Sequence, residues 1–204
     1  MSAVRRFAAG LLLTSDPVLA YVFWHSPLPE VARPEYELAL VEFHRSLGAS
    51  GSHGFLASQS YRIHGAAWIN GGGDAYADWY LIDGSAALDP LNEAAVTGAQ
   101  ESHHGRVAAM AAGGAGGLYR RLSGTGDPAR GLVESWLTKP KETPYAELYE
   151  RLRPFTERES VQLWRRQMVL GPAPEFCLVS DSVVDLPAKL RPMTTRRDPL
   201  STAH

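Results

Sequence analysis

The segment Ala75–Ile82 places the strongest constraint on how this chain can fold. Apolar and aromatic residues crowd into its eight positions, which is typical of a β-strand. Because side chains alternate along a strand, Trp79 and Leu81 share one face while Asp78 and Tyr80 share the other. A tight Asp-Gly turn and a helical run follow directly. The segment therefore predicts half of a β-α unit in an α+β protein, with one apolar face and one mixed face.

The residues around this strand predict a ferredoxin-like order of elements. Alternating apolar runs indicate strands, helical spacing of apolar residues indicates helices, and glycine and proline mark the ends. The expected strands are 19–25, 55–64, 75–82 and 118–122, and the expected helices are 34–48 and 85–96. In chain order this gives strand, helix, strand, strand, helix, strand, which is the βαββαβ order of a ferredoxin-like domain.

Residues 124–128 are rich in glycine, threonine and proline, which indicates a linker. A second, fainter copy of the pattern follows them. Trp136 precedes Pro140 as Trp24 precedes Pro27, which indicates an internal repeat. A helix and a hairpin of 161–170 with 175–179 are expected next. We therefore expect an N-terminal extension at 1–17, a first unit at 18–124, a second, partial unit at 131–181 and an extended tail at 182–204. The prolines of the tail favour a segment that lies along the surface and adds little stability.

The composition limits the kinds of partner that this chain can have. It has 204 residues, a hydrophobic content of 45% and a formal net charge of -2, which suits one globular domain or two small fused repeats. Its arginines occur in pairs and form no basic patch, so we expect neither nucleic acid nor a membrane surface as a partner. We expect a small-molecule ligand instead, and a monomer or homodimer.

The single cysteine, Cys177, excludes an intramolecular disulfide and a cysteine-based metal site, and it favours a reducing, cytoplasmic location. In a strand with no base beside it, it is expected to be an inert buried thiol. At the N-terminus, Phe7–Leu13 follows Arg5-Arg6 and imitates a short signal peptide. The alternatives are a ragged extension or a mis-assigned start. No stretch reaches the ~20 apolar residues of a membrane span.

This order of elements resembles the dimeric α/β-barrel superfamily, in which two ferredoxin-like sheets pack face to face around a shared cavity. The superfamily includes EthD-like proteins, antibiotic-biosynthesis monooxygenases, NIPSNAP-like proteins and the haem enzymes related to chlorite dismutase. The resemblance covers residues 18–181 and rests on element order. It implies an α+β fold of tandem ferredoxin-like units, the second incomplete, whose antiparallel sheets pack as an α/β barrel.

The resemblance does not imply a haem in this chain. The haem enzymes use an axial histidine in the second unit, yet no histidine lies between His104 and His204. His103 and His104 are adjacent, so their side chains point in different directions on any regular element, and a solvated pair at a helix end is the simpler interpretation. We expect no metal and no cofactor.

Two residues on the expected sheet faces are candidates for chemistry. His25 ends an aromatic strand and is the expected general base, although it could instead cap the Ser26-Pro27 turn. Asp78 is expected to orient His25 or to pair with Arg165, and the alternative is a plain salt bridge.

A ligand would contact the aromatic and polar residues that share these sheet faces. The expected substrate-binding residues are Tyr21, Phe23, Tyr61, Trp79, Tyr80, Trp164, Arg165 and Gln167. The aromatic residues could equally form a simple core. If the two units share a lumen, its wall combines the aromatic strands of the first unit with the Arg165 strand of the second, and Arg165 or His25 orients the ligand.

Two functions are compatible with these residues. The first is a cofactor-independent enzyme for a small apolar or aromatic substrate, with monooxygenase-like or isomerase- or lyase-like chemistry. The second is a non-catalytic protein that binds or sequesters a hydrophobic ligand. The position of His25 distinguishes them, since a base must project into a cavity next to a second polar residue.

Overall fold

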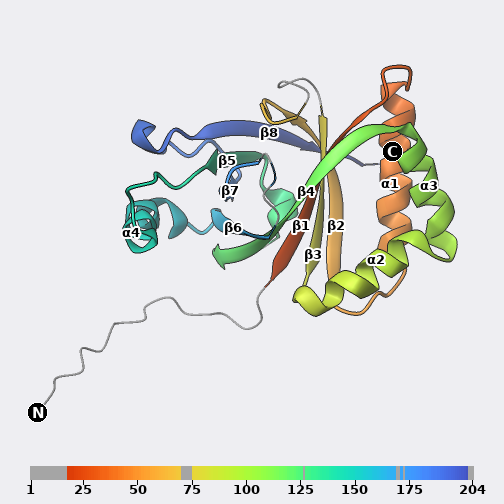
Figure 1. Cartoon of the computed structure of the whole chain (residues 1–204), viewed down its shortest axis with the longest axis horizontal. Helices are drawn as coiled ribbons and strands as arrows, with labels where there is room; N and C mark the ends of the chain where they lie inside the picture. Colours follow the sequence, from red (N-terminus) through yellow and green to blue (C-terminus); the bar gives the residue numbers. More distant parts are fainter. Residues whose placement is uncertain (1–17, 70–74, 126, 169–170, 172, 202–204) are drawn as a thin grey trace, which may run out of the picture.

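Within the residues that the structure describes, eight antiparallel strands form a closed barrel (Figure 1). The structure, a computed structural model, describes residues 18–69, 75–125, 127–168, 171 and 173–201. The strands are β1 (Leu19–Pro27), β2 (Phe55–His64), β3 (Ala75–Ile82), β4 (Ala111–Ser123), β5 (Val133–Leu137), β6 (Gln162–Met168), β7 (Phe176–Ser180) and β8 (Met193–Pro199). The helices are α1 (Arg33–Gly48), α2 (Leu88–Val96), α3 (Ala99–Met110) and α4 (Tyr145–Thr156). The expected extension 1–17 lies outside the described residues.

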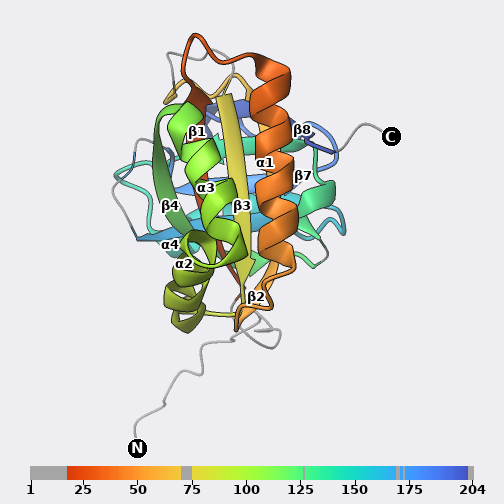
Figure 2. The same cartoon turned by 90° about the vertical axis from the view of Figure 1, so that its right-hand side faces the viewer.

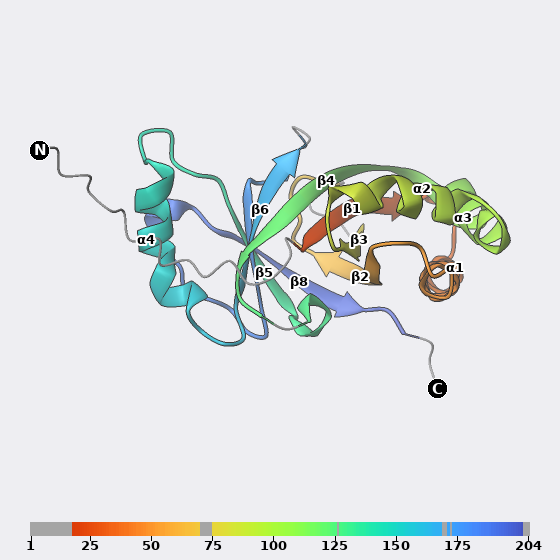
Figure 3. The ribbon, with the colours of Figure 1, turned by 90° about the horizontal axis from the view of Figure 1, so that it is seen from below.

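The helices cover two opposite sides of the barrel. Figures 1 and 3 show α1, α2 and α3 on the side of β1 and β3, and α4 on the far side. Turned by 90°, α1 and α3 lie over β1 and β3 (Figure 2). Within the described residues, none of the helices combines the length and the apolar character that crossing a membrane needs.

The strand order is the same in the two halves of the barrel. The first half has the order β4-β1-β3-β2, and the second has the order β8-β5-β7-β6. Two seams, β2 with β8 and β4 with β6, join the halves into one hydrogen-bonded ring. This arrangement confirms the expected α+β fold with antiparallel sheets in an α/β barrel.

The C-terminal segment differs from the expected tail. Within 182–204, Met193–Pro199 forms β8, which pairs with β2 on one side and β5 on the other. A 3-10 turn at Ala188–Leu190 stands where a helix precedes the last strand of the first half. The segment is therefore part of the barrel, and the prolines near Met193 and at Pro199 lie at its ends, where they remove few ladder hydrogen bonds.

A buried ion pair anchors β8. Arg197 Nη1 lies 3.2 Å from Glu134 Oε1, and both side chains are fully buried. Thr195 Oγ1 and Trp136 Nε1 donate to the other carboxylate oxygen, at 2.9 and 3.0 Å. The guanidinium also lies 4.4 Å from the ring centre of Tyr61. Because each charge is paired and hydrogen-bonded, the lumen tolerates a charged pair that would otherwise cost several kcal/mol.

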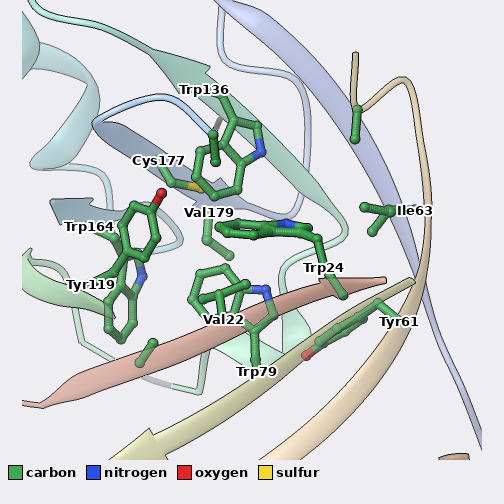
Figure 4. Close-up of a cluster of buried hydrophobic side chains, with 14 of the residues drawn as sticks. Val22, Trp24, Tyr61, Ile63, Trp79, Tyr119, Trp136, Trp164, Cys177 and Val179 are labelled. Atoms are coloured by element: carbon green, nitrogen blue, oxygen red, sulfur yellow. The ribbon is translucent and has the colours of Figure 1, made fainter. Parts of the chain in front are cut away.

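Tryptophans fill the interior of the barrel (Figure 4). Trp24 meets Trp136 edge to face at 5.7 Å, and Trp79 meets Trp164 at 5.5 Å. Tyr61 belongs to the same cluster. The prediction of a shared cavity inside the barrel is therefore wrong, since indole rings occupy that volume. Tyr61, Trp79 and Trp164 are core residues, as the simpler interpretation held.

Strand β4 is longer than expected because its glycines belong to it. It begins at Ala111, whereas the sequence predicted a strand only at 118–122. The rings of β1 lie close against this strand: a Cβ on Gly116 would come within 2.6 Å of the Tyr21 hydroxyl oxygen. A Cβ on Gly114 would come within 2.4 Å of Phe23. The glycine run therefore makes room for aromatic side chains.

Candidate functional site

A cavity of about 620 Å³ lies between the outer face of the first-half sheet and its helices. Its volume is within the usual range for small-molecule sites. Most of its wall is apolar and aromatic, and it is lined among others by Tyr21, Phe23, Phe43, Leu88, Leu91 and Val107. His25, Asp78 and Tyr80 supply polar groups from the sheet, while Asp89, Asn92 and His104 do so from α2 and α3.

Strand alternation positions the polar groups at the sheet. Tyr21, Phe23 and His25 face the helices because they alternate with Val22 and Trp24, which point into the barrel. On the neighbouring strand β3, Asp78 lies opposite Phe23 in the register and its side chain faces the same way. The sequence predicted that Tyr21, Phe23 and His25 share one face of β1 and that Asp78 and Tyr80 share one face of β3, but not that the two faces lie side by side.

His25 is held by two partners. Its Nδ1 lies 2.6 Å from the Tyr36 hydroxyl oxygen, and its Nε2 lies 3.2 Å from Asp78 Oδ2. The imidazole also stacks on Tyr76, with ring centres 5.8 Å apart. The side chain is only 2% exposed. The alternative in which His25 caps the Ser26-Pro27 turn is therefore wrong.

A second histidine, His44 on α1, contacts the other side of the same carboxylate. Its Nε2 lies 3.2 Å from Asp78 Oδ1, and its Nδ1 lies 2.8 Å from Ser58 Oγ. The ring stacks on Tyr80, whose hydroxyl donates to Asp78 Oδ2 at 3.1 Å. The sequence analysis missed His44, although one signal was present: it lies next to Phe43 on the buried stripe of the helix, where a polar residue needs a partner.

The electrostatics of the cluster fix its protonation pattern in part. Burial raises the pKa of Asp78, but the charges and hydrogen bonds of His25 and His44 outweigh it and hold that pKa well below the usual range. Burial, and then the charge of Asp78, raise the pKa of Tyr36 and of Tyr80. Asp78 is therefore a carboxylate and both phenols keep their protons. With its proton in place, Tyr36 donates to His25 Nδ1 when that nitrogen carries no proton.

Arg165 and Gln167 lie away from this site. Arg165 Nε is 3.4 Å from Glu175 Oε1, and its guanidinium stacks 4.2 Å from the ring centre of Tyr145. Gln167 is exposed. The predicted pairing of Asp78 with Arg165 is therefore wrong. The prediction that residues of both halves form one cavity wall is wrong as well. Strand alternation predicted which residues share a face, but it could not say which face the helices cover.

In the sheet–helix layer of the second half, the side chains of one buried apolar cluster pack between the sheet and α4. Leu137, Leu148, Leu152 and Leu178 pack there, together with Phe176. With no histidine between His104 and His204, this half does not fit a histidine-ligated haem. Cys177 is buried, and burial raises the pKa of its thiol. Among the described residues, no group of three or more histidine, cysteine and acidic side chains has the arrangement of a metal site.

Comparison with known proteins identifies the fold. No family model and no curated protein matches the sequence. Among solved structures, a protein provisionally described as a monooxygenase, from Lactobacillus acidophilus NCFM, is 9% identical with a TM-score of 0.56, and the match covers 91% of this chain and 95% of that one. A protein provisionally described as a chlorite dismutase is 12% identical with a TM-score of 0.51, over 90% of this chain and 95% of that one. At these identities the likeness concerns the fold alone. The chain therefore shares its overall fold with these two proteins.

Proposed function

We propose that this protein is an enzyme that removes a proton from a small, largely apolar substrate, with His25 as the proton acceptor and Asp78 as its charged partner. One observation carries the proposal: a buried carboxylate flanked by two histidines lies at the floor of a mainly apolar cavity. Burying such a group is costly unless it is paired, so a cavity that only had to hold an apolar molecule would be cheaper to build without it.

The geometry suggests how the proton reaches His25. Both ring nitrogens have neighbours, and the neighbour of Nδ1 is the hydroxyl of Tyr36, which lines the cavity. Tyr36 takes the substrate proton as its own proton passes to Nδ1. One bond from the substrate to hydrogen breaks, one N–H bond forms, and the tyrosine ends as it began. Because burial raises the pKa of Tyr36, the phenol does not ionise alone and acts only together with His25.

The cavity supports a substrate with one or two rings and a C–H or O–H group made acidic by a neighbouring carbonyl or aromatic system. Its stacked Tyr21 and Phe23 favour a flat molecule. The substrate anion would form beside the Tyr80 hydroxyl and the imidazolium of His25. We propose that no cofactor takes part, so that the reaction is an isomerisation, an elimination or an oxygenation in which the substrate anion itself reacts with oxygen.

We also propose a reducing cellular compartment and a site formed by a single chain. A lone, buried Cys177 supports a reducing compartment such as the cytoplasm. The barrel closes within one chain, which supports a site that needs no residue from a second copy.

Solvent exchange tests this function without knowledge of the complete reaction. Purified protein is incubated in D2O with a panel of small cyclic ketones, phenols and hydroquinones, and deuterium incorporation is followed by NMR. At least one compound should exchange, and His25→Asn should slow that exchange by at least about 100-fold. His64→Asn is the matched control, because His64 pairs with Asp198 at the surface, outside the cavity; it should leave exchange unchanged.

The runner-up function is a carrier for a hydrophobic ligand, which the mainly apolar wall favours. It predicts that compounds raise the melting temperature and co-purify with the protein, but that none exchanges a proton faster than in buffer. It also predicts that His25→Asn binds them as well as the wild type does.

A further inference from the structure

A second cavity lies on the opposite side of the histidine–aspartate cluster. It has a volume of about 290 Å³ and is lined by His44, Arg45, Ser58 and Ser201 among others. His25 and Asp78 line the first cavity, whereas His44 lines only the second. Several residues around the second cavity, including Arg45 and Ser201, are exposed, so it communicates with solvent.

A continuous series of contacts links the two cavities. From the first cavity it runs from the Tyr36 hydroxyl to His25 Nδ1 at 2.6 Å, and from His25 Nε2 to Asp78 Oδ2 at 3.2 Å. It continues from Asp78 Oδ1 to His44 Nε2 at 3.2 Å, and ends with His44 Nδ1 at 2.8 Å from Ser58 Oγ. The two imidazoles thus share one carboxylate, and each has a hydroxyl at its other nitrogen.

One carboxylate balances one buried imidazolium, and two would leave an uncompensated charge in the interior. The groups around the imidazoles do not change this balance. His25 faces Tyr36 of α1 and Tyr76 of β3, and His44 faces Ser58 of β2 and Tyr80 of β3, all of them uncharged. Farther away, Asp89 and His104 lie on the helical wall of the first cavity, and the cation Arg45 borders the second. Within the described residues, Asp78 is the only carboxylate in contact with either ring.

We propose that His44 is the proton outlet of the site: when His25 gains a proton from the first cavity, His44 releases one to the second. The inference rests on the proposed function. At His25 an N–H bond forms at Nδ1, and at His44 the N–H bond at Nδ1 breaks, its proton passing by way of Ser58 Oγ to water in the second cavity. Asp78 stays a carboxylate throughout, and the cluster carries the same net charge before and after.

This separation solves a problem set by the apolar cavity. A bound substrate excludes water from the first cavity, so a proton held on His25 has nowhere to go but back to the substrate. An outlet on the other side of α1 lets charge leave while the substrate remains bound. His44 is in this sense a positioning residue, because it acts through Asp78 and does not touch the substrate.

The first arm of the test is NMR of the side-chain nitrogens of His25 and His44 in the wild-type protein without substrate, across a pH series. The two rings should share one additional proton. The second ring should therefore become doubly protonated only at a distinctly lower pH than the first. In His44→Asn, His25 alone should take up the proton that the two rings otherwise share, since no second imidazole competes for Asp78. Two rings that titrate independently would overturn the proposal, and this result needs no enzyme activity and no variant.

The second arm follows the fate of the abstracted proton. For a compound that exchanges with D2O, His44→Asn and Ser58→Ala should lower kcat by about tenfold with KM unchanged and increase the return of the original hydrogen to the substrate. Ser135→Ala, which removes a buried hydroxyl of β5 in the second half, outside both cavities, is the control and should behave as wild type. Unchanged return in both variants would also overturn the proposal. If no compound exchanges at all, the proposed function fails while the first arm still decides whether the histidines share a proton.

Discussion

The two halves of the barrel have the same strand order but use the space outside their sheets differently. Trp24 pairs with Ala77 in the first half, and Trp136 pairs with Cys177 in the second, so these pairs align the halves. On that alignment, the position of His25 is taken by Leu137 in the second half.

The same alignment places Leu178 at the position of Asp78, and Phe176 at that of Tyr76. The second half packs these residues against α4 into an apolar cluster, whereas the first half holds a cavity with a charged floor. The barrel therefore tolerates either an apolar packed layer or a cavity with a buried charged cluster outside the sheet. Burying the charged cluster costs free energy, which points to a function that the second half does not share.

The largest expected effect tests the strand that completes the second half. Arg197→Met should cost about 3–5 kcal/mol of unfolding free energy, because Glu134 would stay buried without its partner. Urea denaturation of the variant measures this loss. Arg196→Met changes the exposed neighbour and should cost less than about 0.5 kcal/mol. Equal stability of the two variants would show that β8 does not depend on this ion pair.

The next effect concerns the charge that distinguishes the first half. Asp78→Asn should reduce proton abstraction by at least about 100-fold, because His25 loses its counter-charge. It should also remove a pH-dependent part of the stability. Since the pKa of Asp78 is lower in the folded than in the unfolded protein, this part is present above about pH 4 and is lost as the pH falls below it.

Denaturation of wild type and Asp78→Asn at a series of pH values checks this sign. The difference between them should shrink as the pH falls below about 4. Asp185→Asn, an exposed substitution in the second half, should track the wild type at every pH. A difference that grows on acidification would contradict the assignment of Asp78 as a paired carboxylate.

A smaller effect is expected where β4 makes room for the cavity wall. In Gly116→Ala the new Cβ would push Tyr21 toward the cavity, since the three atoms nearest to it are all side-chain atoms of that tyrosine. Binding of any cavity ligand should weaken by about tenfold, or about 1.4 kcal/mol, with a modest loss of stability. Isothermal titration calorimetry measures the affinity. Gly105→Ala on α3 meets no atom within 4 Å and should bind as wild type does.

The smallest effect concerns the residue opposite Trp136. Cys177→Ala copies the alanine that the first half has at that position, so it should cost only about 1 kcal/mol by calorimetric melting. Cys177→Ser should cost more, because it buries a hydroxyl among apolar neighbours. If serine were tolerated as well as alanine, the barrel interior would be less dry than its tryptophans indicate.

The sequence predicted much of the fold because the relevant residues alternate clearly. Tyr21, Phe23 and His25 share one face of β1, and Asp78 and Tyr80 share one face of β3, as period-two patterns require. Which face looks into the barrel could not be predicted, because both faces carry aromatic residues. Only the packing of four indoles inside the ring decides that question.

The sequence did not predict β8 or the role of His44, and the reason is different. The inward residues of β8, Thr195 and Arg197, are polar, so the strand shows no apolar alternation and resembles a tail. Their partner, Glu134, is about 60 residues away in the chain, and no local pattern reports such a pairing. His44 likewise gains its meaning from Asp78 on another element.

The two seams of the barrel also bear on how the chain folds. β8 comes last of the eight strands along the sequence, yet it pairs with both β2 and β5 and thereby closes one of the seams. During synthesis the first half emerges with Trp24 and Trp79 on a sheet face that nothing yet covers. Such long-range pairing makes folding slow and leaves partly folded chains prone to aggregate. Closure of the ring of strands is thus a late, all-or-none step. A ribosome-bound chain that ends before β8 should depend on chaperones far more than one that includes it.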